Sequence, residues 1–161
     1  MNEQLADATR IVTFRLGPDL FAADIAAVER VLKYETPRGI PNVPAWIEGV
    51  IEYQGRVVPV IDLRRRFELA HDGAGTHTRM IVFSTETELV AVVVDAVLDV
   101  RALPESELAE PPAFFRGLAG AYLRGLARRD GELVVVLDAN RLLSSRDRLA
   151  LEPALRAGSD A

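Results

Sequence analysis

The chain has 161 residues, of which 49% are hydrophobic and 27% are charged. This length suits one domain or two very small ones, and the composition excludes wholesale disorder and fibrous repeats. The formal charge of −5 argues against nucleic-acid binding, and the absence of cysteine excludes disulfides and cysteine-ligated metals.

Residues 1–8 are expected to form a flexible N-terminus, and short strands follow. Apolar, β-branched residues predict strands over 11–16 and 20–23, which a Gly-Pro-Asp turn joins into a hairpin. Apolar residues at helical spacing predict a short helix over about 24–31: Val28, Val31 and Leu32. Two further strands, 46–53 and 56–61, flank Gln54-Gly55, a pair typical of a two-residue hairpin turn.

The residues after this second hairpin predict a turn and a loop. Asp62 is expected to cap a short helix. The stretch 70–78 is small and polar, which predicts a loop.

The second half of the chain repeats the first. A shift of 69 residues aligns apolar positions: Phe14 with Phe83, Leu20 with Leu89, Val28 with Val97, and Val31 with Val100. A shift of 76 aligns turn and capping residues: Gly49 with Gly125, Gly55 with Gly131, and Asp62 with Asp138. The difference, 76 − 69 = 7, places about seven extra residues in the stretch 104–120.

We therefore predict a mainly β protein in which two small β-barrels share a hydrophobic seam. The domain is expected to span 9–143, with one barrel over about 9–69, the loop 70–78, and the other barrel over 79–143. Each half of about 75 residues is marginal by itself, so the two are expected to pack together. Trp46 is expected to pack into the first barrel, with an exposed recognition role as the alternative.

The C-terminal tail, 144–161, carries a loose amphipathic pattern that Pro153 interrupts. It predicts a short helix that covers a barrel and then frays. An interaction tail is the alternative.

Catalytic and metal-binding chemistry is not expected. The two histidines, His71 and His77, lie in the predicted loop and are expected to be solvated, since a metal site needs rigid placement. We expect no catalytic residue, no metal and no cofactor. Apolar runs such as 89–94 fall short of the roughly 20 residues of a membrane span, so we expect a cytoplasmic protein without membrane insertion.

Three stretches carry a family resemblance. They are 49–64 (GVIEYQGRVVPVIDLR), 92–100 (VVVDAVLDV) and 131–138 (GELVVVLD). In this order they resemble the CheW family of chemotaxis adaptors, and the similarity runs from about Thr9 to Leu143.

The resemblance implies a fold and partners. The fold would be two five-stranded, SH3-like barrels on a common core. The function would be to link the cytoplasmic tips of chemoreceptors to the regulatory domain of a CheA-like histidine kinase. The family's receptor groove lies between the barrels, which makes Val28 and Val31 receptor-groove candidates; the alternative is that both are core residues. The family's kinase-facing edge lies on the first barrel, which makes Arg30, Gly49 and Gln54 kinase-interface candidates.

Two of these positions depart from the family pattern. Arg30 stands where the family has glutamate, and Gln54 stands where it has arginine. The fold is not affected by either change, but the choice of partner is. The alternatives are a CheW-like receptor-binding protein that has lost or changed its kinase contact and, from another class, a barrel protein that binds a small ligand or an oligonucleotide.

Overall fold

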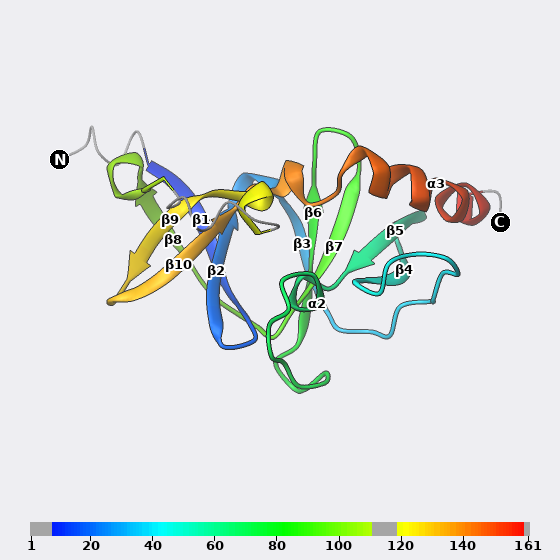
Figure 1. Ribbon diagram of the computed structural model, residues 1–161, viewed down its shortest axis with the longest axis horizontal. Helices are drawn as coiled ribbons and strands as arrows, with labels where there is room; N and C mark the ends of the chain where they lie inside the picture. Colours follow the sequence, from blue (N-terminus) through cyan, green and yellow to red (C-terminus); the bar gives the residue numbers. More distant parts are fainter. Residues whose placement is uncertain (1–7, 111–118, 160–161) are drawn as a thin grey trace.

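The computed structural model describes residues 8–110 and 119–159 and shows two β-barrels side by side (Figure 1). Barrel I is one five-stranded sheet in the order β8-β1-β2-β10-β9, and barrel II is the other, in the order β3-β6-β7-β5-β4. The strands of barrel I are β1 (Ala8–Leu16), β2 (Asp19–Asp24), β8 (Ala96–Pro104), β9 (Leu123–Arg129) and β10 (Glu132–Leu137). Those of barrel II are β3 (Val28–Lys33), β4 (Ile47–Tyr53), β5 (Arg56–Ile61), β6 (Arg79–Ser84) and β7 (Leu89–Val94).

The barrels do not divide as the two halves of the sequence do. The hairpin β1–β2 completes its barrel with three strands of the second half, while β3, β4 and β5 pair with β6 and β7. Parallel pairing of β2 with β10 and of β5 with β7 joins the two halves in each barrel. The structure thus differs from the expected barrels over 9–69 and 79–143. The reason is that the chain crosses to the other barrel after β2 and again after β7.

The internal repeat is nevertheless visible in backbone contacts that are related by the shift of 76. The amide of Asp62 donates to the carbonyl of Trp46 (2.7 Å), and the amide of Asp138 donates to the carbonyl of Tyr122 (2.8 Å). Each aspartate then caps the following turn, Asp62 at the amide of Arg64 and Asp138 at the amide of Asn140. The predicted caps are therefore confirmed.

Glycine is required at two of the repeated positions for the same reason. Gly49 lies beneath the carbonyl of Arg38, and Gly125 lies beneath the carbonyl of Ala109, where a side-chain carbon would collide with the backbone. In the hairpin turn, Gln54 and Gly55 both have positive φ, 50° and 76°. This is the geometry of the two-residue turn that the sequence predicts.

The predicted helix over 24–31 is wrong. Only Ile25–Ala27 form a 3₁₀ turn, which Asp24 caps, and Val28 begins strand β3. Pairing of β3 with β6 decides the conformation, since β-branched residues fit a sheet and helical spacing over so few residues is weak evidence. Val28 and Val31 therefore lie on an edge strand.

Three hydrophobic clusters hold the barrels together. One fills barrel I around Leu20 and Val136, and one fills barrel II around Val60 and Met80. The largest lies between the barrels and includes Phe14, Phe83 and Leu123. This third cluster, the seam core, is the shared hydrophobic seam that the sequence predicts.

Two helices border the seam. Helix α2 (Leu63–Arg66) follows β5, and helix α3 (Ser145–Ser159) runs along β5 on the outside of barrel II (Figure 1). Leu151 of α3 is fully buried in the seam core, which confirms that the tail covers a barrel. The helix continues past Pro153, so it is longer than the sequence pattern indicates. The expected flexible N-terminus, apart from Ala8, and residues 111–118 of the predicted insertion lie outside the described residues.

Because both barrels depend on one seam core, we expect calorimetry to show a single unfolding transition. Phe14→Ala should lower the free energy of unfolding by about 3–5 kcal/mol and should reduce hydrogen-exchange protection in both barrels together. Leu149→Ala, at an exposed position of α3, is the control and should change stability little. Two separate transitions would show that the barrels are independent.

Candidate interaction sites

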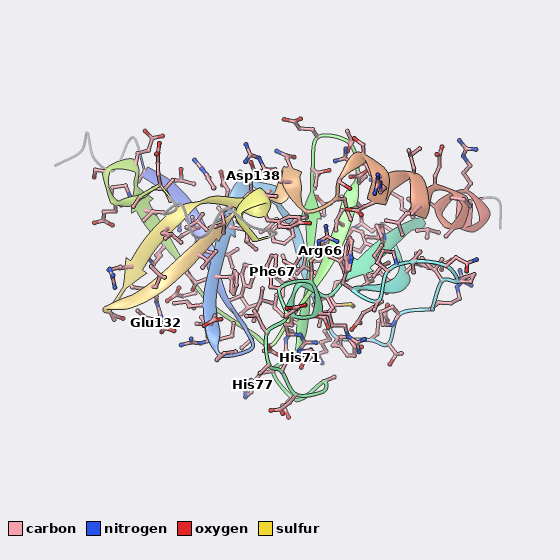
Figure 2. The ribbon with its side chains drawn as sticks, viewed as in Figure 1. Arg66, Phe67, His71, His77, Glu132 and Asp138 are labelled. Carbon is pink, nitrogen blue, oxygen red and sulfur yellow. The ribbon has the colours of Figure 1, made fainter. Side chains whose placement is uncertain are left out.

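A cleft of about 510 Å³ opens where the two barrels meet. One wall comes from the crossing segment at Asp24–Ala27, another from the β6–β7 turn, and the third from the end of β10, near Asp138 in Figure 2. Its floor includes Leu137 and Ala139, which belong to the seam core. An apolar floor of this kind suits the apolar anchors of a partner.

The rim of this cleft is polar. Within barrel I, Arg124 of β9 forms an ion pair with Asp24 at the end of β2 (3.7 Å). The side chain of Asn140 accepts a hydrogen bond from the amide of Glu86 in the β6–β7 turn (3.0 Å). The hydrogen bond of Asn140 with Glu86 therefore joins the two barrels at this rim.

The two receptor-groove candidates differ in exposure. Val28 follows Ala27 of the cleft wall and packs partly against the seam core, whereas Val31 is 42% exposed on the outer side of β3. The structure therefore gives Val28 a packing role and leaves Val31 open to solvent.

Two kinase-interface candidates lie together at the edge formed by β3 and the β4–β5 turn. The guanidinium of Arg30 lies over the ring of Tyr53, 5.8 Å from its centroid, and the exposed Gln54 follows Tyr53 in the turn. The shifts of 69 and 76 place Asp99 and Arg129 at the equivalent positions of barrel I, where they form an ion pair (2.5 Å). In each barrel, therefore, one side-chain contact joins the two edge strands of the sheet. In barrel II it is the cation–π contact of Arg30 with Tyr53, and in barrel I it is the ion pair of Asp99 with Arg129. Gly49, the third candidate, lies in the β4 bulge beneath Arg38.

A charged network that begins directly after β5 connects the two barrels. Arg64 donates to the buried Asp62 (2.9 Å) and to Asp95 (2.5 Å), and Asp95 accepts the amide of Gly17 in barrel I (2.6 Å). Burial alone would raise the pKa of Asp62, but the hydrogen bonds and charge of Arg64 hold that pKa below its usual value. The sequence indicated the cap at Asp62 but not the partner, because Arg64 and Asp95 meet only in the fold.

Glu48 borders this network. Its carboxylate is half-buried and accepts a long hydrogen bond from the hydroxyl of Tyr34 (3.5 Å). Burial, together with the negative charge of Asp62, raises the pKa of Glu48. Burial and the charge of Glu48 in turn raise the pKa of Tyr34.

Helix α2 is fixed by an aromatic cluster that the sequence did not reveal. The guanidinium of Arg66 lies 3.9 Å from the ring centroid of Trp46 and 5.1 Å from that of Tyr122. The shift of 76 makes Tyr122 the equivalent of Trp46 in the repeat. Phe67, beside Arg66 in Figure 2, stacks on Phe21 at 5.9 Å. Trp46 was expected to pack into the first barrel. It is instead half-buried against the seam core between the barrels and is part of this cluster.

The loop 70–78 carries both histidines. His71 and His77 are exposed and extend below the seam in Figure 2. Within residues 8–110 and 119–159, no group of three or more metal-binding side chains is gathered.

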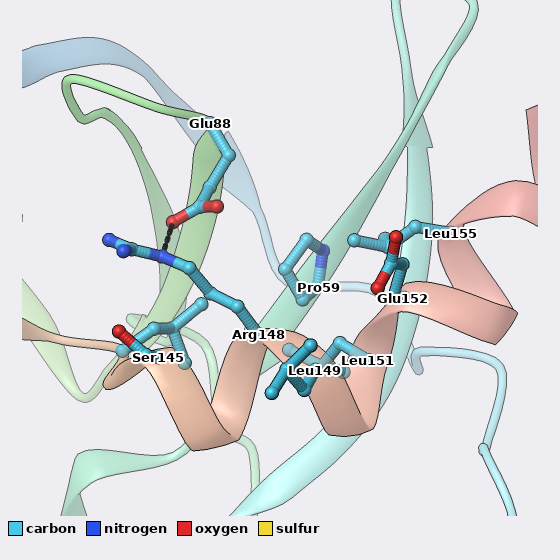
Figure 3. Close-up of a pocket in the computed structure, with 9 residues that line it drawn as sticks. Pro59, Glu88, Ser145, Arg148, Leu149, Leu151, Glu152 and Leu155 are labelled. Atoms are coloured by element: carbon cyan, nitrogen blue, oxygen red, sulfur yellow. Dashed lines mark hydrogen bonds and ion pairs between the residues drawn. The ribbon is translucent and has the colours of Figure 1, made fainter.

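An apolar pocket of about 390 Å³ lies between α3 and barrel II (Figure 3). Leu151 and Leu155 of the helix and Pro59 of β5 line it, and an ion pair between Arg148 and Glu88 (2.7 Å) closes one side. This ion pair ties the first turns of α3 to the β6–β7 turn.

Comparisons with known proteins agree with this architecture. The crystal structure of the scaffolding protein CheW from Thermoanaerobacter tengcongensis matches with a TM-score of 0.79 and 29% identity, over 87% of this chain and 95% of that one. The chemotaxis protein CheW of Klebsiella aerogenes is 34% identical over 83% of this chain and 81% of its own. The protein FrzA of Myxococcus xanthus is 29% identical over 86% and 87%.

The fold and these relatives define a scaffold protein of chemotaxis signalling. The CheW-like domain family matches residues 10–147, and the chain belongs to this family. No helix in the described part of the chain combines the length and the apolar character that crossing a bilayer requires.

Glu48→Gln should stabilise the protein at neutral pH. A carboxyl whose pKa is raised by folding favours the folded state below its unfolded pKa, and this contribution is lost as the pH rises through the folded value. The substitution removes the unfavourable charge, so the gain should be largest near pH 7 and should shrink toward pH ~4. Urea unfolding at both pH values measures it, with the exposed Glu107→Gln as control. A gain that does not depend on pH would contradict this explanation.

Proposed function

We propose that this chain is a cytoplasmic, non-catalytic adaptor that joins the tips of chemoreceptors to the regulatory domain of a CheA-type histidine kinase. The observation that carries the proposal is membership of the CheW-like family over residues 10–147, nearly the whole chain. The fold supports it, because one rigid unit presents two separate surfaces, the inter-barrel cleft and the β3/β4 edge.

The cleft and the neighbouring strand β3 are the proposed receptor surface. The cleft offers an apolar floor with a polar rim, which suits a helical hairpin that presents apolar residues along one face. Val31 is an exposed apolar residue on β3, whereas Val28 packs partly against the seam core. In this proposal Val31 contacts the receptor, and Val28 contributes mainly through packing.

The proposed kinase surface is the edge with Arg30 and Gln54. Charged groups across an interface mainly determine specificity and the rate of encounter. A kinase domain that complements glutamate and arginine at these positions would meet a reversed charge at Arg30 and no charge at Gln54. The partner of this chain should therefore carry compensating residues.

A second candidate function is a receptor-binding protein without kinase contact. The observation that favours it is the stacking of Arg30 on Tyr53, which engages this guanidinium within the protein. The test is a binding assay with a chemoreceptor cytoplasmic fragment and a CheA regulatory domain, separately and together. A ternary complex supports the adaptor, binding to the receptor alone supports the second candidate, and binding to neither contradicts both.

Val31→Lys should weaken binding of the receptor fragment by about tenfold or more, since it places a charge on an apolar contact. Its melting temperature should stay close to that of the wild type, because the side chain is exposed. Val28→Lys should instead lower stability by about 1–3 kcal/mol. Leu133→Lys, at a similarly exposed position on β10, is the control. Unchanged receptor binding by a folded Val31→Lys protein would remove β3 from the receptor surface.

Arg30→Glu combined with Gln54→Arg should tighten binding to a conventional CheA regulatory domain by about 1–3 kcal/mol. Part of the gain should fade at high salt, because these side chains are exposed. Titration calorimetry of the wild type, both single variants and the double variant measures it. Asp130→Arg, in the equivalent turn of barrel I, is the matched control. Equal affinities in all proteins would show that both positions face solvent in the complex.

A further inference from the structure

The internal repeat reveals one sheet edge that is closed in barrel I and open in barrel II. In barrel I, the guanidinium of Arg101 on β8 donates to the backbone carbonyl of Arg128 on β9 (2.8 Å). The shifts of 69 and 76 place Leu32 and Glu52 at the equivalent positions of barrel II. Leucine has no donor, so the carbonyl of Glu52 lacks the contact that closes the other edge.

The register of the hairpin determines where the backbone of Glu52 points. Tyr53 and Arg56 close the two-residue turn, so Glu52 and Val57 form the next pair, whose backbone groups point away from each other. Val50, two residues earlier, points outward in the same way, and it exchanges two hydrogen bonds of 2.9 Å with Arg38. In the described part of the chain, no such partner meets the outward N–H and C=O of Glu52.

A slot of about 510 Å³ lies beside this open position, between β4 and the segment that precedes Arg38. Glu35 and Thr36 line one side, and Val50, Glu52 and Val57 line the other. The carboxylates of Glu35 and Glu52 are exposed, and neither has an ion pair among the described residues. Two carboxylates against the single guanidinium of Arg38 give the slot a negative charge.

We propose that this slot binds an extended, basic segment of a partner protein, which pairs with the backbone of Glu52 as an added strand. Backbone pairing would supply the geometry, and an arginine or lysine of the segment would lie between Glu35 and Glu52. A second copy of this chain is a poor occupant, because pairing of two β4 edges would oppose these carboxylates. The site uses neither the inter-barrel cleft nor Arg30, but it lies on β4, the strand that Gln54 follows, and beside Gly49. It therefore rests on the proposed function and extends the β3/β4 edge along β4.

The experiment uses the full chain and a defined probe. The probe is a fluorescein-labelled nine-residue peptide of alternating arginine and threonine, capped at both ends. A glutamate–threonine peptide and an arginine–threonine peptide with alternate amides N-methylated are the controls. We expect fluorescence anisotropy to detect binding of the first peptide only, and we expect the peptide to slow hydrogen exchange of the Glu52 amide in NMR spectra.

Two variants separate backbone pairing from charge. Glu52→Pro removes the outward N–H without breaking the ladder with β5, as prolines on edge strands do, and should weaken peptide binding. The loss of one hydrogen bond corresponds to about 3- to 10-fold. Arg128→Pro, the equivalent in barrel I, should leave binding unchanged. Glu35→Gln with Glu52→Gln should also weaken binding, whereas Glu105→Gln with Glu107→Gln, an equal loss of charge on the surface, should not.

The proposal is overturned if the N-methylated peptide binds as well as the unmodified one, since the contact would then be electrostatic only. It is also overturned if the Glu52 amide of the wild type is not protected at saturating peptide, a result that does not depend on the folding of any variant. Protection of Glu52 without peptide, together with dimers in sedimentation, would assign the edge to self-pairing instead.

Discussion

The seam core between the barrels is the constraint on which the rest of the structure depends. The chain crosses from one barrel to the other after β2 and again after β7, so neither barrel can be completed from one half of the sequence. Apolar residues on the strands of both barrels then pack against each other in the seam core. This arrangement gives two small barrels, each marginal alone, the stability of one larger unit. It also explains why both surfaces of the proposed adaptor are held in a fixed relation.

Polar contacts at the seam help to determine how the two barrels are oriented against each other. Arg64 connects Asp62 to Asp95, and Asp95 holds the first hairpin turn through the amide of Gly17. Burying these charges is unfavourable by itself. The network therefore contributes mainly by fixing the arrangement of the two barrels, and less by adding to stability. Arg66 has a similar effect on the other side of α2, where it lies between the repeated aromatic residues Trp46 and Tyr122.

The two barrels have the same backbone fold, but the side chains at their edge strands differ. Barrel I closes with Asp99, Arg101 and Arg129, whereas barrel II has a cation–π contact at Arg30 and an open backbone at Glu52. Edge strands need such protection, because unpaired backbone groups invite other strands. In a repeated fold, therefore, the positions where the second copy closes an edge and the first does not are the places to look for partners.

The sequence by itself determined the turns, the caps and the repeat. Gly55 and Asp62 act through their immediate neighbours in the chain, so their roles could be predicted together with the mainly β class and the shared core. The repeat also marked Gly49, but its contact with the carbonyl of Arg38 was decided by the fold. The strand at Val28–Lys33 and the exchange of strands between barrels could not, because pairing with β6 overrides a local helical pattern. The contacts of Arg64 with Asp95, of Arg66 with Trp46 and of Arg30 with Tyr53 were also decided only by the tertiary structure. Each of these guanidinium groups meets a residue that is distant in sequence or on another strand, and long side chains carry no local signal of where they end.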